Sequence, residues 1–168
     1  MELLIVRHAI AFERDPKRWR DDNERPLSPR GEARAREAAL GLRQVVGRPV
    51  IVLSSPLVRA RQTAAILTDV AGWPRARETA ALAPGNSPDA LLASLKRLTE
   101  TRIAVVGHEP DLSRLLAAAL QGKAAAKGFR LKKMGAALVT FDGAARAGQG
   151  RLDWLLPPKA LRGLAITP

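Results

Sequence analysis

The sequence predicts an α/β fold in a single domain covering residues 1–168: a three-layer α/β/α sandwich with a mostly parallel central sheet and an antiparallel C-terminal strand or hairpin. Short aliphatic runs alternate with helical patterns from the N-terminus to Leu120, which is typical of parallel α/β sheets. Beyond Gly122, two strand-like runs are separated by a turn rich in Gly and Ala, which indicates an antiparallel pair. With 168 residues, of which 46% are hydrophobic, the chain is long enough for one substantial core.

The first elements have clear boundaries in the sequence. Residues 2–7 are a short aliphatic run and predict a buried strand. Residues 9–27 are polar and irregular and predict a long loop, of the kind that is usually either functional or disordered. Ser28 and Pro29 are typical of a helix start, and apolar residues at helical spacing continue to about Val46, where a Gly and a Pro end the helix.

The alternation continues to the end of the chain, with Gly or Pro at most boundaries. A Ser-Pro pair at Ser87 repeats the helix-start signal seen earlier. The other expected elements are a strand at 50–54, a helix at 57–71, a short strand at 75–79, a helix at 88–98, a strand at 102–107, a helix at 110–120, and strands at 134–142 and 151–156.

The charge of the chain is strongly positive. Twenty-eight Lys and Arg residues against sixteen Asp and Glu residues give a formal net charge of +12. Such a field attracts anions: nucleic acid, a membrane surface, a phosphorylated protein or small phosphates. The excess of Arg over Lys has a second explanation, a GC-rich genome. The charge therefore favours a phosphate-bearing partner and does not choose among the classes.

Composition also limits the compartment and the chemistry. The chain has no Cys, which excludes disulfides, thiolate metal sites and cysteine nucleophiles. A cytoplasmic location is expected, because a chain without disulfides suits a reducing compartment. No apolar run approaches the ~18 residues of a membrane span, and the N-terminus lacks the pattern of a signal peptide.

The two histidines of the chain each end a predicted buried strand. His8 follows Arg7 at the end of the first strand, and His108 follows Gly107 at the end of the strand at 102–107. In open α/β folds, reacting groups gather at the carboxyl ends of the strands. Two imidazoles at one edge, one of them beside an arginine, indicate anion chemistry on histidine. A histidine that only caps backbone groups at a strand end is the alternative for His8.

Arg59 falls in the first turn of the predicted helix at 57–71. A cation there opposes the helix dipole, which makes it a poor place for a purely structural arginine. A bound anion reverses that argument, since backbone N–H groups and the guanidinium then act together. The alternative is a solvated surface arginine.

Four motifs occur in the order and at the structural places of a known family. They are Leu4-Ile5-Val6-Arg7-His8, Arg25-Pro26-Leu27-Ser28-Pro29-Arg30-Gly31, Ser54-Ser55-Pro56-Leu57-Val58-Arg59-Ala60-Arg61-Gln62-Thr63 and Val105-Val106-Gly107-His108-Glu109-Pro110. The sequence resembles the histidine phosphatase (phosphoglycerate mutase-like) superfamily over about residues 2–157. Its short length is similar to that of the small SixA-type phosphohistidine phosphatases.

The resemblance implies a role for each residue of the site. His8 attacks phosphorus and forms a phosphohistidine intermediate, which water then hydrolyses. Arg7 and Arg59 clamp the phosphoryl oxygens with a fork geometry that Lys lacks, and Arg25 also reaches the phosphate. His108 donates a hydrogen bond that stabilises charge in the transition state. No metal and no cofactor are expected, because arginines and imidazoles supply the positive charge.

The sequence departs from the family pattern at two places. Many members have Gly directly after the first histidine, and this chain has Ala9. The general acid of larger relatives has no convincing counterpart, and Glu78 is only a near candidate. Since the imidazole of a phosphohistidine leaves more easily than an alkoxide, a weak acid suffices for that substrate. The departure therefore favours phosphohistidine over phosphate esters.

The expected partner is a phosphorylated protein, for example a histidine-containing phosphotransfer domain, bound by a monomer or weak dimer. No specific nucleic-acid binding and no membrane binding are expected. The basic stretch at 123–133 is either a solvated rim or a landing surface for an acidic phosphoprotein or a polyanion. Its cations are Lys123, Lys127, Arg130, Lys132 and Lys133.

Two other functions remain open from the sequence. The first is a phosphatase on the same scaffold whose substrates are small phosphate esters, nucleotides or polyphosphate. The second is a non-catalytic basic module that binds nucleic acid or a phosphoprotein. This function explains the charge but not both histidines at strand ends. The sequence also contains no RNP, helix-turn-helix or zinc-finger pattern. A metal hydrolase is disfavoured because the histidines form no ligand motif such as H-E-x-x-H.

Overall fold

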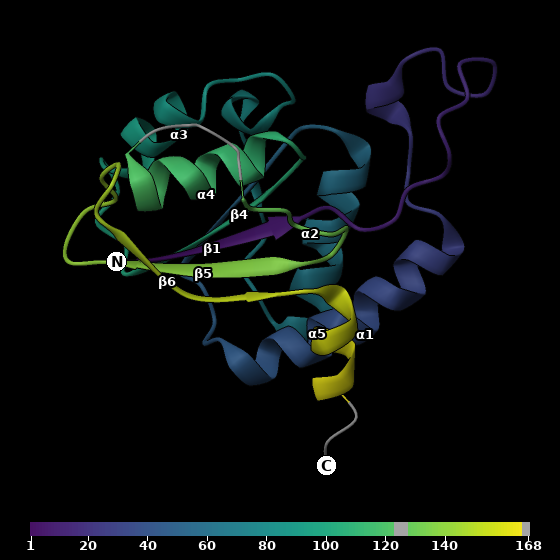
Figure 1. Cartoon of the computed structure of the whole chain (residues 1–168). Coiled ribbons are helices and arrows are strands. Elements are labelled where there is room, and N and C mark those ends of the chain that lie inside the picture. Colours follow the sequence, from purple (N-terminus) through teal and green to yellow (C-terminus); the bar gives the residue numbers. More distant parts are fainter. Residues whose placement is uncertain (123–127, 166–168) are drawn as a thin grey trace.

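The computed structural model describes residues 1–122 and 128–165, and its strands and helices alternate along most of the chain (Figure 1). Two further turns of 3-10 helix lie at Asp22–Glu24 and Ala80–Leu82. The strands and α-helices are β1 (Glu2–Arg7), α1 (Pro29–Val45), β2 (Ile51–Ser54), α2 (Val58–Ala71), β3 (Arg77–Glu78), α3 (Pro88–Leu95), β4 (Arg102–Gly107), α4 (Asp111–Gln121), β5 (Ala136–Phe141), β6 (Gly150–Leu156) and α5 (Pro158–Leu164).

In the described residues, six strands form one sheet in the order β3-β2-β4-β1-β5-β6. The first four in this order pair in parallel, and β5 runs antiparallel to both β1 and β6. The predicted fold class, a mostly parallel sheet with an antiparallel C-terminal hairpin, is confirmed. Because Arg7 pairs with Gly107 and Ser54 with Val106, β1, β2 and β4 end at the same edge of the sheet.

Helices cover both faces of the sheet and complete three layers. One core joins α1, α2 and α5 to the face that carries Leu4 and Val6, and the other joins α3 and α4 to the face that carries Leu3 and Ile5. Alternate residues of β1 thus enter opposite cores, as the two-residue period of a strand requires. Figure 1 shows α3 and α4 on one side of β1 and β5, with α1 and α5 on the other.

The C-terminal part differs from the expectation in two respects. The strand predicted to begin at Met134 begins at Ala136, because Met134 has φ 64° and its amide bonds to the carbonyls of Arg7 and His8 at 3.1 and 3.2 Å. Helix α5, which the sequence did not predict, packs on α1 at Gly41. A Cβ on Gly41 would lie 1.7 Å from the carbonyl oxygen of Leu161, so only Gly permits this approach.

The predicted loop at 9–27 is tied down at several points. Ala11 and Leu27 form an isolated antiparallel bridge, and the Leu27 amide donates to Gln62 Oε1 on α2 at 2.7 Å. The Arg18 guanidinium lies 4.4 Å from the ring centroids of both Phe12 and Trp19. The side chain of Trp19 therefore packs against other side chains of the same loop. In the described part of the chain, no helix combines the length and apolar character that a membrane crossing requires.

Candidate active site

The carboxyl edge of β1, β2 and β4 opens into a cleft of about 400 Å³. Five residues singled out in the sequence lie in its wall: Arg7, His8, Arg25, Arg59 and His108. They come from the end of β1, the loop before α1, the first turn of α2 and the end of β4. The cleft is also lined by Arg14, Asp22, Asn23, Leu57, Pro84, Glu109 and Lys133.

His8 is held in one orientation by its own backbone neighbour. Its ring Nδ1 lies 2.7 Å from the carbonyl oxygen of Ala9, and the side chain is buried. A carbonyl only accepts hydrogen bonds, so Nδ1 carries the proton and donates it. The other ring nitrogen, Nε2, therefore keeps its lone pair, which is the form a nucleophilic imidazole needs.

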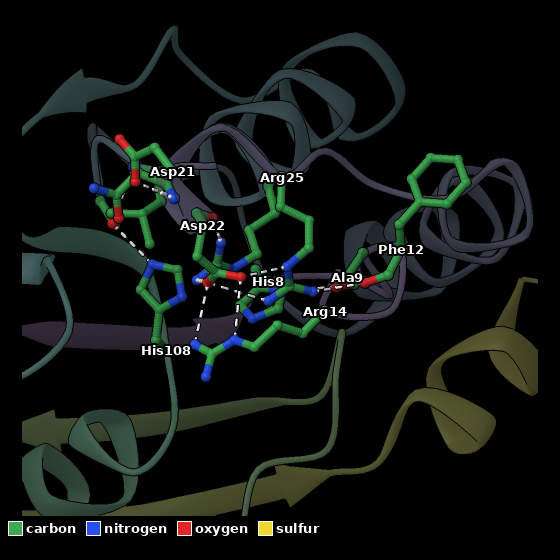
Figure 2. A network of polar contacts seen from close by, with 12 residues as sticks. His8, Ala9, Phe12, Arg14, Asp21, Asp22, Arg25 and His108 are labelled. Atoms are coloured by element: carbon green, nitrogen blue, oxygen red, sulfur yellow. Dashed lines mark hydrogen bonds and ion pairs between the residues drawn. The ribbon is translucent and has the colours of Figure 1, made fainter. Parts of the chain in front are cut away.

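His108 lies beside His8, with ring centroids 5.0 Å apart and planes inclined by 50°. Its Nε2 is 2.8 Å from Ser55 Oγ, and its buried Nδ1 has no hydrogen-bond partner among the residues that the structure describes. In Figure 2 this Nδ1 points toward the side where His8 lies. Ser55 Oγ already accepts from the Leu57 amide at 3.3 Å, which favours donation of its own proton to Nε2. Nδ1 then carries a proton and can donate it into the cleft.

Both imidazoles are neutral in the free protein at neutral pH. Burial is the main cause that lowers the pKa of His8 to about 3, followed by its neighbour His108. Burial also lowers the pKa of His108 to about 3, followed by the nearby charge of Arg59. A neutral His8 is a competent nucleophile without prior loss of a proton.

Three arginines converge on one carboxylate, as Figure 2 shows in part. Asp22 accepts from Arg25 Nε at 2.8 Å and from Arg14 Nε at 3.3 Å, and Arg59 lies 3.3 Å from its other carboxylate oxygen. The Asp22 carbonyl also accepts from Arg59 at 2.7 Å. The hydrogen bonds from Arg25 are the main cause that holds the pKa of Asp22 well below its usual range. These guanidinium groups form a site that already holds an anionic group.

Arg7 is fixed through a chain of contacts. One of its terminal nitrogens donates to the Leu131 carbonyl at 2.8 Å, while the Leu131 amide donates to Glu109 at 2.7 Å. Glu109 also accepts from the Ser113 hydroxyl at 2.7 Å. Burial lowers the pKa of Arg7, and Glu109 acts against that shift. The carboxylate next to His108 is therefore committed to holding the segment that positions Arg7.

Thr63 connects the nucleophile to α2. Its hydroxyl donates to the Arg59 carbonyl at 2.7 Å and accepts from the Ala9 amide at 3.0 Å. Ala9 in turn supplies the carbonyl that fixes His8. Among the described residues, Met134 is the only non-Gly residue with a positive φ. Ala9 therefore has an ordinary backbone conformation and needs none of the freedom of Gly.

The structure does not bring Glu78, the near candidate for a general acid, into this cleft. Glu78 lies in β3 and pairs with Arg61 at 3.6 Å. It faces a different hollow of about 470 Å³ against α2. Lys123 and Lys127 of the basic stretch lie outside the described residues, and Lys133 lines the cleft.

Sequence reasoning missed the residues that organise the site. Asp22 stands three residues before Arg25 in a loop without periodicity, so nothing in the pattern separated it from other polar residues. Ser55 and Thr63 lie within one of the family motifs, but the sequence alone assigns them no role. Ser55 directly follows a strand end, and Thr63 shares a helix face with Arg59 because the two are four residues apart; these positions are the available signals.

The arrangement is suited to phosphoryl transfer. It offers a neutral nucleophile, a second imidazole beside it and several guanidinium groups around one opening, where a phosphoryl group's equatorial oxygens need positive donors. In the described residues, no group of three or more His, Asp or Glu is arranged to hold a metal ion.

Comparisons with known proteins identify the family. A model of the histidine phosphatase superfamily (branch 1) matches residues 3–83, and an uncharacterised protein of Picosynechococcus sp. is 34% identical over 94% of this chain and 100% of its own length. The chain belongs to the histidine phosphatase superfamily. The structure of this chain matches that of the protein histidine phosphatase SixA complexed with tungstate, with a TM-score of 0.83, 27% identity, and coverage of 96% and 99% of the two chains.

A second solved structure agrees in fold. A protein of Agrobacterium tumefaciens described as a candidate phosphohistidine phosphatase SixA gives a TM-score of 0.77 at 23% identity, covering 94% of this chain and 97% of the other. The match to the SixA structure spans nearly the whole of each chain, so this chain is of the small SixA type. The second structure supports the fold.

Proposed function

We propose that the protein is a metal-independent phosphatase that hydrolyses protein phosphohistidine through a covalent intermediate on His8. The observation that carries this proposal is the state of His8: neutral, with Nδ1 fixed by the Ala9 carbonyl and Nε2 free at the wall of an arginine-lined cleft. Arg7, Arg25 and Arg59 bind the phosphoryl oxygens, and His108 donates from Nδ1.

The reaction proceeds in two displacements. The lone pair on His8 Nε2 forms a bond to phosphorus as the phosphorus–nitrogen bond of the substrate breaks, and the leaving imidazole nitrogen takes up a proton from solvent. Water then attacks the phosphorus on His8, releases inorganic phosphate and returns Nε2 to its neutral form. Positive donors stabilise the charge on the equatorial oxygens in both steps.

The choice of phosphohistidine follows from the state of the carboxylates. Of the two that line the described cleft, Asp22 is held ionised by arginines, and Glu109 accepts hydrogen bonds from Ser113 and Leu131. Both carboxylates are thus engaged as hydrogen-bond acceptors, and neither is free to serve as the general acid. An alkoxide leaving group needs a proton from such an acid, whereas the imidazole of a phosphohistidine is a better leaving group and can take its proton from solvent.

The physiological partner that fits this reaction is a phosphorylated protein, for example a histidine-containing phosphotransfer domain of a signal transduction pathway. The proposed setting is the cytoplasm, with the enzyme acting as a monomer or weak dimer. An open cleft at the edge of the sheet suits a substrate residue presented on a protein surface.

Trapping the intermediate tests the proposal. Incubation with a phosphohistidine peptide is expected to leave acid-labile phosphate on His8, and His8→Ala is expected to lose turnover by at least about 10³-fold. Turnover of the phosphohistidine peptide is expected to exceed that of p-nitrophenyl phosphate and sugar phosphates. Full activity of His8→Ala overturns the proposed mechanism, and a preference for sugar phosphates overturns the assignment of phosphohistidine as the substrate.

A further inference from the structure

We propose that a basic hollow beside the catalytic cleft binds an acidic segment of the phosphorylated protein substrate. The inference rests on the proposed function, because it assigns the surface that accompanies the phosphohistidine. The basic hollow has a volume of about 200 Å³, and five of its lining residues are cations: Arg34, Lys132, Lys133, Lys159 and Arg162.

The charge of the basic hollow is almost uncompensated. Among the described residues, no Asp or Glu lines it, and Arg162 pairs with Glu37 at 3.4 Å from outside. Among the ion pairs of the described residues, none involves the other four cations. Cations gathered around a concave surface reinforce one another's field, so the basic hollow attracts an anionic ligand.

The basic hollow adjoins the reacting group. Lys133 lines both the basic hollow and the catalytic cleft, and Ala9, which fixes His8, lines the basic hollow as well. A protein that places a phosphohistidine in the cleft therefore brings the residues near that histidine over the basic hollow. Acidic side chains of that protein are then attracted to the cations of the basic hollow, which a small phosphorylated molecule is too short to contact.

Part of the backbone around the basic hollow is held by close packing. The walls of the basic hollow come from the start of α1, the segment before β5 and the connection from β6 to α5, which lie together at one end of the molecule (Figure 1). A Cβ on Gly31 would lie 1.8 Å from the Ile10 carbonyl oxygen, so α1 rests directly on the loop after β1. Backbone that is already held avoids part of the ordering cost of binding.

The lining favours carboxylate side chains over a bound phosphate chain. Pro157 and Pro158 form one wall and have no backbone N–H to offer a phosphate, unlike the amide-rich sites that bind phosphate groups. Ala9, Ala35 and Met134 add apolar surface, against which the methylene groups of Glu can pack. Three of the cations are Lys, which attract a charge without demanding bidentate geometry.

Two phosphohistidine peptides test the assignment, one with four flanking Glu residues and the other with four flanking Gln residues. We expect kcat/KM to be about tenfold higher for the acidic peptide, and Arg34→Gln/Lys159→Gln to bring this ratio near one. Neither residue lines the catalytic cleft, so turnover of phosphoramidate should stay unchanged. Lys96→Gln/Arg97→Gln removes the same charge at the end of α3 and should keep the ratio.

The same ratio in wild type and Arg34→Gln/Lys159→Gln overturns the proposal, as does a wild-type ratio near one. Fluorescence anisotropy with a labelled, unphosphorylated Glu peptide tests the basic hollow without chemistry, and that double variant should weaken binding by a similar factor. Phosphoramidate turnover tests the proposed function alone, so the two failures are distinguishable. The wild type could instead bind inorganic tripolyphosphate but not the Glu peptide, with that binding lost in the double variant. This result would identify polyphosphate as the occupant and overturn the proposal.

Discussion

At the scale of single residues, the two histidines predict a simple spectroscopic result. The pKa of each imidazole lies at about 3, far below the ordinary value of 6.5, chiefly because both side chains are buried. The chain has no other histidine, so the imidazole C–H signals in an NMR spectrum belong to these two. We expect neither set to titrate between about pH 8 and pH 5. A midpoint near 6.5 for either histidine contradicts this account.

The same lowered pKa values fix the sign of the pH dependence of stability. Between about pH 6.5 and pH 3 the unfolded chain binds protons on His8 and His108, whereas the folded chain does not. The free energy of unfolding therefore rises with pH across this window, by up to about 1.4 kcal/mol per pH unit for each histidine. Denaturant unfolding at several pH values measures the slope, and His108→Gln should reduce it. An unchanged slope in that variant contradicts the prediction.

Asp22 occupies the centre of the arginine cluster, so its charge competes with a phosphate for the same donors. Asp22→Asn keeps the side-chain size and removes the charge. We expect the inhibition constant of inorganic phosphate to fall by about threefold to tenfold. The control is Asp21→Asn, because Asp21 is outside the cleft lining and its side chain accepts from the Asn23 amide, as Asn also can. Weaker inhibition in Asp22→Asn shows instead that the carboxylate mainly orders the arginines.

At the scale of elements, Thr63 joins the exit of β1 to helix α2. Thr63→Val removes the acceptor of the buried Ala9 amide at nearly constant volume, which should lower the free energy of unfolding by about 1–3 kcal/mol. The Ala9 carbonyl then holds His8 less well, so we expect kcat to fall by about tenfold with little change in KM.

Thr63→Ser keeps the hydroxyl and loses only the methyl group, so this variant should retain kcat. If the packing of the methyl group were what matters, kcat would fall in Thr63→Ser instead. Single-turnover kinetics with phosphoramidate separate the phosphorylation of His8 from product release. A drop in kcat of equal size in Thr63→Ser and Thr63→Val contradicts the role of the hydroxyl.

The elements also show what local sequence could predict. The strand patterns at 2–7 and 102–107 and the Ser28 cap before α1 are local signals, and the structure confirms them. Helix α5 was missed because it spans seven residues, too few for a helical period to stand out, and its packing on Gly41 depends on a distant segment. The strand order and the place of Asp22 likewise depend on contacts between segments remote in sequence.

At the scale of the whole molecule, the net charge of +12 acts on both the substrate and the fold. It raises the local concentration of anionic substrates, and it also makes the folded chain repel itself. Salt screens both effects, since the Debye length falls from about 20 Å near 20 mM to below 10 Å near 200 mM. The two consequences have opposite signs, which makes them easy to separate.

Raising NaCl over this range should lower kcat/KM for phosphoramidate severalfold, because the anion is attracted less strongly. The value of kcat at saturating substrate should stay constant, since the contacts around His8 are buried and screened little. Over the same range the thermal unfolding midpoint should rise, because self-repulsion weakens. Steady-state kinetics and calorimetry in the same buffers measure both. A parallel fall in kcat and in the unfolding midpoint would show that salt acts by unfolding the protein, and would remove the role assigned to its charge.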